Sequence, residues 1–317
     1  MARKIRIPTT ISAEATAYLG RDPGSASWPT TPDEWKEMRT TLRNGFNAAS
    51  QSVHDAFVER IDVETINGVR VERVVPKSRS RAADSKAVMY LFGGGYISGS
   101  PWEGITLSAP LAHSLGIDVW AVDYPLAPEN PYPAALDASL VVYKHLCETY
   151  GADNVGVSGD SAGGNLTLAT VLRAMADGLP PPAVLALFSP WSDLTDGGDT
   201  MRTLEGIDPD LDFDSYLGKS AAAYAGERDT SDPEISPLYA AYPEGFPPTI
   251  ISTGTRDLLL SDCARLHLTL KRAGVPASLN VWEGMWHDFE FYPEIPEGQE
   301  SLAEMAGFLA AYLEIDV

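Results

Sequence analysis

The sequence predicts an α/β protein in which a mostly parallel sheet is covered by helices on both faces. Eight short runs rich in β-branched and aromatic residues recur along the chain, at 57–66, 69–75, 86–92, 117–124, 154–159, 183–190, 248–254 and 277–284. Helical stretches separate the later runs, at 103–115, 134–150, 161–177, 260–273 and 299–313. Such alternation is typical of parallel strands joined by helices. In sheets of this kind ligands bind at the carboxyl ends of the strands, so functional residues are expected there.

Composition limits the class of protein further. The chain has 317 residues, 44% of them hydrophobic, which is enough for a large buried core. Its formal charge of −21 argues against binding to nucleic acid or to an anionic membrane, because both are bound through basic patches. The sequence shows neither a long apolar span nor a secretory leader, so no stable membrane insertion and a cytoplasmic location are expected. Cys147 and Cys263 lack the spacing of a metal site or a disulfide framework and are expected to be small buried hydrophobes.

Two regions interrupt the alternation. Residues 1–55 are helix-prone and have no strand partner, and residues 191–235 form a long acidic insertion between two predicted strands. A connection this long usually has helices of its own and covers something. We expect both regions to form a cap over the mouth of a site in a catalytic domain comprising residues 56–317. An insertion that only decorates the surface is the alternative.

A candidate nucleophile lies where a predicted strand meets a predicted helix. Residues 159–163 read Gly-Asp-Ser-Ala-Gly and fit G-x-S-x-G, with the strand before and the helix after that this motif requires. Its glycines permit a turn so tight that a Cβ atom would clash, which exposes the hydroxyl of Ser161 above the sheet. A serine that serves only as a helix cap is the alternative.

A serine hydroxyl needs a base to take its proton. Among the five histidines, His287 alone follows a predicted strand directly, while the others lie in helical stretches or in the N-terminal region: His54, His113, His145 and His267. The imidazole in turn needs a carboxylate that orients it. Asp257 follows the strand at 248–254 and is the best candidate. Asp262 lies a turn into the next helix, and the side chain of Asp288 is expected to point away.

A glycine run after the predicted strand at 86–92 completes the site. The backbone N–H groups of Gly94 and Gly95, with that of Ala162, are predicted to form an oxyanion hole, since glycine lets a ligand approach the backbone closely. The chain order Ser161, Asp257, His287 is that of the α/β-hydrolases. A flexible glycine loop is the alternative.

Together these segments resemble the hormone-sensitive-lipase-like family of α/β-hydrolases, the bacterial family IV esterases. The matching segments are LFGGGYISGS at 91–100, VDYPLAPENPYPAAL at 122–136, GDSAGGNLTLA at 159–169, GTRDLLLSD at 254–262 and GMWHDF at 284–289. The resemblance implies an α/β-hydrolase fold, a carboxylic ester hydrolase with an N-terminal cap, the triad Ser161, Asp257 and His287, and no metal or organic cofactor. It also implies a homodimer through the strand near 277–284.

Two positions depart from the family pattern. The glycine run of the family usually follows a histidine, where this chain has Phe92, and its DYRLAPE segment has an arginine where this chain has Pro125. Phenylalanine can accept no hydrogen bond, so we infer that packing holds the oxyanion loop here. The backbone donors are unchanged, and activity should survive.

The sequence therefore predicts a serine esterase for short- to medium-chain carboxylic esters, acting through an acyl-enzyme. A hydrolase of medium-ring lactones is the nearest alternative, because a cyclic ester presents the same carbonyl. A small-molecule binding protein on the same fold is the alternative of another class, and the presence of His287 weighs against it. Six residues of the motif loops and the insertion are candidates for the substrate pocket: Phe92, Tyr96, Asp160 and Trp286 from the motifs, and Trp191 and Tyr216 from the insertion.

Overall fold

A single eight-stranded sheet forms the centre of the molecule in a computed structural model, which describes residues 6–21 and 28–316. The strand order is β1-β2-β4-β3-β5-β6-β7-β8. β2 pairs antiparallel with β1 and β4, and the remaining pairs are parallel. The strands are β1 (Val58–Ile66), β2 (Val69–Pro76), β3 (Ala87–Leu91), β4 (Asp118–Val122), β5 (Val155–Asp160), β6 (Val184–Phe188), β7 (Thr249–Gly254) and β8 (Ala277–Trp282). The mostly parallel eight-stranded sheet predicted from the sequence is thus confirmed.

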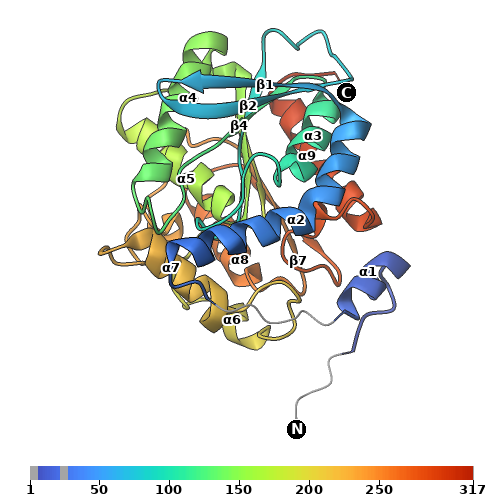
Figure 1. The fold of residues 1–317 in the computed structure, drawn as a ribbon. Helices are drawn as coiled ribbons and strands as arrows, with labels where there is room; N and C mark the ends of the chain where they lie inside the picture. Colours follow the sequence, from blue (N-terminus) through green and yellow to red (C-terminus); the bar gives the residue numbers. More distant parts are fainter. Residues whose placement is uncertain (1–5, 22–27, 317) are drawn as a thin grey trace.

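Helices cover both faces of this sheet. α3 (Ile105–Leu115) packs on α9 (Pro296–Tyr312), α4 (Ala134–Tyr150) packs on α5 (Ser161–Ala176), and α8 (Leu260–Arg272) contacts β7 and β8. Figure 1 shows α3 and α9 on one side of the sheet and α4 and α5 on the other. All five predicted helical stretches are present.

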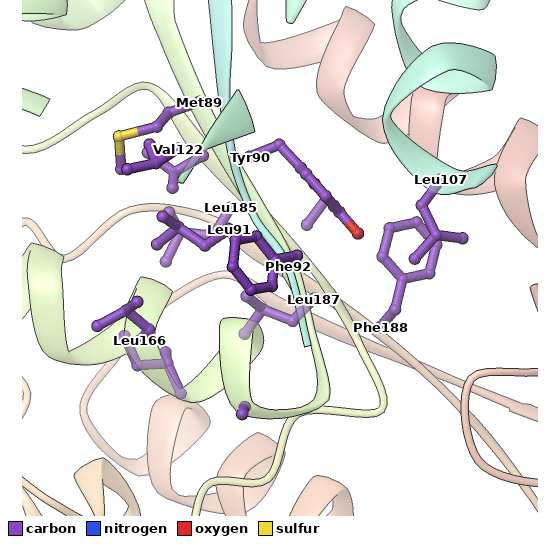
Figure 2. Packing of buried hydrophobic residues seen from close by; sticks show 14 of the residues in the cluster. Met89, Tyr90, Leu91, Phe92, Leu107, Val122, Leu166, Leu185, Leu187 and Phe188 are labelled. Atoms are coloured by element: carbon purple, nitrogen blue, oxygen red, sulfur yellow. The ribbon is translucent and has the colours of Figure 1, made fainter. Parts of the chain in front are cut away.

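The central strands are buried along their whole length. β3, β4, β5, β6 and β7 expose almost nothing, as expected of parallel strands covered on both faces. Figure 2 shows apolar side chains of β3, β4 and β6 packed between Leu166 of α5 and Leu107 of α3. Because these strands are held on both faces, the loops at their carboxyl ends start from fixed points.

The two regions that interrupt the alternation contain helices, as expected. Within 1–55 the structure has α1 (Ala13–Leu19) and most of α2 (Pro32–Phe57), which begins at a capping box between Thr31 and Glu34. Within 191–235 it has α6 (Thr200–Thr203), a π-helical turn η2 (Phe213–Leu217) and α7 (Gly218–Ala225). Figure 1 shows α6 and α7 on the side of the molecule away from the β1–β2 hairpin, whereas α2 ends where β1 begins. Three 3₁₀ turns lie elsewhere: η1 (Ala152–Asn154), η3 (Pro237–Tyr239) and η4 (Phe289–Phe291).

Several other expectations concern the surface. β8 is an edge strand and exposes Val281, but the homodimer stays a prediction. Cys263 is buried and Cys147 is partly buried, and both are free thiols. In the described part of the chain, no helix is long and apolar enough to cross a membrane. Residues 6–21 and 28–316 also contain no cluster of His, Cys, Asp and Glu arranged to hold a metal ion.

Candidate active site

Ser161 lies in a strained turn between β5 and α5. Its φ of 50° places it in the left-handed region, which residues with a Cβ atom rarely adopt. Gly163 allows this turn, because a Cβ there would lie 2.0 Å from the carbonyl oxygen of Leu91. The carbonyl oxygen of Ser161 accepts a hydrogen bond from the N–H of Trp191, at 3.0 Å, which fixes the turn from the other side. Strain held by so many neighbours is typical of a functional position.

The candidate base and acid meet at the ends of β7 and β8. His287 Nδ1 lies 3.3 Å from Oδ1 of Asp257, which is fully buried. Asp257 is held in turn by the N–H of Leu259 on Oδ1, at 2.8 Å, and by the hydroxyl of Thr253 on Oδ2, at 2.6 Å. Burial would raise the pKa of Asp257, but the neighbouring charge and hydrogen bonds of His287, with the Thr253 bond, hold it below the ordinary value. Asp257 is therefore an ionised group able to orient the imidazole.

Asp288 does not point away from the imidazole, contrary to the sequence prediction. Its backbone is left-handed, with φ of 49°, and this turns the carboxylate back so that Oδ2 lies 3.0 Å from Nε2 of His287. Burial would lower the pKa of His287, but the charges of Asp288 and Asp257 outweigh it and raise the pKa well above the usual value. Among the described residues, no hydrogen bond joins the Ser161 hydroxyl to His287. In a catalytic triad the histidine Nε2 faces the serine hydroxyl. In this structure Nε2 of His287 contacts Asp288 instead.

The glycine loop after β3 faces Ser161. Gly94 and Gly95 have φ of 105° and 63°, and both line the same cavity as Ser161 and His287. Ala162 follows Ser161 in the first turn of α5 and is fully buried. Asp160 fastens the start of this loop, because its Oδ2 accepts the N–H of Gly93 at 2.8 Å. Asp160 thus braces the loop besides lining the cavity.

The loop at Phe92 is held by packing, as inferred from the missing histidine, but also by hydrogen bonds, which that inference left out. The ring of Phe92 stacks on Tyr124, with centroids 4.0 Å apart, and the Tyr124 hydroxyl donates to the carbonyl oxygen of Phe92 at 2.5 Å. A further contact comes from α2, where the Arg39 guanidinium donates to the carbonyl oxygens of Ile97 and Ala127, both at 2.8 Å. Sequence reasoning missed Arg39, since nothing in its own surroundings indicates a loop 58 residues away.

A cavity of about 660 Å³ opens over Ser161. Its apolar wall includes Met38, Leu42 and Phe46 of α2. Residues of the insertion form another wall: Gly206, Asp208, Pro209, Asp210, Leu211, Asp212, Ser215 and Tyr216. Every charged side chain in the lining is acidic except His287: Glu103, Asp160, Asp208, Asp210, Asp212 and Asp288. Burial and the charge of Asp257 raise the pKa of Asp208 to about 7, and burial also raises the pKa of Asp210.

The cavity includes only part of the predicted pocket. Phe92, Asp160 and Tyr216 line it. The prediction is wrong for Tyr96, Trp191 and Trp286, none of which lines the cavity. Tyr96 stacks on Tyr224 and its hydroxyl donates to Asn165, at 2.7 Å. Trp191 belongs to the main core, and Trp286 stacks on Tyr18 of α1 with centroids 4.1 Å apart. A place next to a motif in sequence did not fix the direction of these side chains.

Comparisons with known proteins identify the family. A sequence profile described as alpha/beta hydrolase fold matches residues 88–291. The chain belongs to this family. An esterase of Acinetobacter venetianus is 32% identical over 251 residues, which cover 78% of this chain and 81% of that protein.

Solved structures place the chain within the family. The crystal structure of esterase E25 aligns with a TM-score of 0.90 at 30% identity, covering 99% of this chain and 98% of that one. An esterase from the bacterial hormone-sensitive lipase family aligns with a TM-score of 0.83 at 29% identity, covering 95% and 99%. The chain is thus one of the carboxylic ester hydrolases of the hormone-sensitive lipase family.

Proposed function

We propose that this hydrolase cleaves short- to medium-chain carboxylic esters through an acyl-enzyme on Ser161. One observation carries the proposal. Ser161, in a strained turn, shares a cavity with His287, and Nδ1 of His287 contacts the buried, ionised Asp257. This is the arrangement that nucleophilic acyl transfer needs.

In the first step, His287 Nε2 takes the proton of Ser161 while Oγ forms a bond to the ester carbonyl carbon. The tetrahedral oxyanion is stabilised by the N–H groups of Gly94, Gly95 and Ala162, and one such donor typically contributes about 3 kcal/mol. His287 then gives the proton to the leaving alcohol as the C–O bond breaks. In the second step, water loses a proton to His287, attacks the acyl carbon and releases the acid.

This step needs Nε2 of His287 to leave Asp288. Ser161 and Asp288 both line the cavity, and we expect rotation of the Asp288 side chain to free Nε2 for the serine hydroxyl. Contacts of this kind are often long in the free enzyme and tighten when substrate binds.

We further propose that residues 1–55 and 191–235 act together as a cap. Support comes from the lining of the cavity, to which α2 contributes Met38, Leu42 and Phe46 and the insertion contributes residues 206, 208–212, 215 and 216. A cavity of about 660 Å³ walled by these segments fits a small substrate.

The proposal is tested with p-nitrophenyl acetate and butyrate. Ser161→Ala should remove turnover of both, whereas Ser158→Ala, a serine buried three residues earlier in β5, should retain it. Turnover that persists in Ser161→Ala would exclude this nucleophile. A wild-type protein that binds these esters without hydrolysing them would be the binding protein instead. A series of linear esters from acetate to dodecanoate, run beside medium-ring lactones, then decides the substrate class.

A further inference from the structure

Asp208, in the insertion at 191–235, lies unexpectedly close to the proposed triad. It is 5% exposed, and its carboxylate accepts four backbone N–H groups. No motif marked this residue in the sequence, and its side chain makes no contact that the mechanism above uses.

The local sequence fixes one half of this carboxylate. Oδ1 accepts the N–H of Asp210 at 2.9 Å and that of Leu211 at 3.1 Å. The first bond closes the turn that aspartate commonly forms with the residue two positions on, and Pro209 between them restricts the backbone. Because Oδ1 is held by its own segment, Oδ2 is directed away from that segment, towards the loops after β7 and β8.

Oδ2 joins the two loops that carry the proposed acid and base. It accepts the N–H of Leu258, the residue after Asp257, at 2.9 Å, and the N–H of His287 itself at 3.3 Å. These loops follow β7 and β8, so one oxygen atom links them directly above the sheet edge. The contact between Asp257 and His287, at 3.3 Å, depends on the separation that this oxygen sets.

The insertion has a second anchor on the same loop. The hydroxyl of Thr200 donates to the carbonyl oxygen of Leu258 at 2.8 Å and accepts the N–H of Ser261 at 2.9 Å. Thr200 and Asp208 thus hold the two sides of one peptide segment. The insertion therefore holds the loop that carries the Asp257 carboxylate.

We propose that Asp208 is a positioning residue for ester hydrolysis: it fixes the loops after β7 and β8 relative to each other and thereby aligns His287 with Asp257. This inference rests on the proposed function. It makes the insertion part of the catalytic apparatus, in addition to its place in the cavity wall.

The test is a double-mutant cycle of Asp208→Asn and Asp257→Asn. In Asp208→Asn the amide must turn its N–H donors towards one of the two pairs of backbone N–H groups, so the residue loses either the bridge or its anchor on Asp210 and Leu211, while its size is unchanged. A misplacement of the reacting groups by about 1 Å costs on the order of 100-fold, so we expect kcat to fall about 10- to 100-fold with KM nearly constant. In the Asp257→Asn background the same change should cost less than about threefold, because the aligned pair is already lost.

The matched control is Asp214→Asn, the same chemical change in the same insertion on an exposed carboxylate paired with Arg202. It should keep kcat. Thermal melting is recorded for every variant, and Asp208→Ser, which removes the charge without adding opposed donors, is measured in parallel in case Asp208→Asn does not fold.

Three results would overturn the inference. They are a kcat within twofold of the wild type in a folded Asp208 variant, a rise in KM at constant kcat, or the same loss of kcat with and without the Asp257 substitution. Failure of the proposed function itself looks different, because Asp257→Asn alone would then retain wild-type kcat.

Discussion

Replacing Asp288 by asparagine should move the acid limb of the pH–activity profile to lower pH. The Asp288 carboxylate lies 3.0 Å from Nε2 of His287 and stabilises the protonated imidazole. Only the neutral imidazole can accept a proton, so the wild type should gain activity as pH rises through the raised pKa of His287. Asparagine removes the charge, lowers that pKa, and makes the base available at lower pH.

The size of the change follows from the contact distance. Two unit charges 3.0 Å apart at an effective dielectric constant of about 20 attract by about 5.5 kcal/mol, or about 4 pH units. The real change is smaller, because the cavity admits solvent and the asparagine oxygen can still accept a hydrogen bond. Four other carboxylates that act on His287 also remain: Asp160, Asp208, Asp210 and Asp257. Neighbouring opposite charges commonly shift a pKa by about 1 to 3 units, which is the movement we expect.

The assay is kcat/KM for p-nitrophenyl butyrate across the pH range in which the protein stays folded. Asp214→Asn is the control and should leave the midpoint in place, since this exposed carboxylate pairs with Arg202. An acid limb that stays within about 0.3 pH units of the wild type in Asp288→Asn would refute the reasoning. A shift to higher pH would refute its sign.

Three further results are expected. Gly163→Ala should lower the free energy of unfolding, measured with denaturant, by at least about 3 kcal/mol, because the added Cβ would lie 2.0 Å from a carbonyl oxygen. The control Gly307→Ala, where the Cβ meets open space, should stabilise α9 by about 1 kcal/mol. Phe92→His should change kcat less than about tenfold, since the loop is held by stacking on Tyr124 and by backbone bonds; a collapse of kcat would contradict this. Burial raises the pKa of Glu290 to about 7, so this carboxyl binds more protons in the folded than in the unfolded protein. The free energy of unfolding of the wild type should therefore fall by up to about 3 kcal/mol as pH rises from about 5 to about 8. Chemical denaturation should show this loss reduced in Glu290→Gln; an identical pH dependence in both proteins would contradict it.

Much of the fold could be predicted because buried parallel strands are nearly continuous apolar runs. The run before Gly159 and the one before Asp257 each end in polar residues, and the carboxyl ends of parallel strands meet at one edge. This is enough to bring Ser161, Asp257 and His287 to one place from distant parts of the sequence. The structure places them there and joins the last two directly.

The remainder depends on features that sequence patterns do not carry. The direction of the Asp288 side chain follows from a single left-handed residue, and aspartate adopts that conformation only occasionally. Asp208 and Arg39 act on loops far away in the chain, and their partners are defined only once the insertion and α2 have docked. Trp191 was expected in the pocket as part of the insertion, yet it packs into the core.

The stack between Tyr18 and Trp286 has a practical consequence for handling this enzyme. Trp286 precedes the proposed base, so α1 packs against the loop that carries His287. The backbone N–H and hydroxyl of Ser12 donate to Glu297 and attach α1 to α9. Trimming the first twenty residues would open one face of a buried indole to water. An N-terminally shortened version should therefore lose turnover before it loses its sheet.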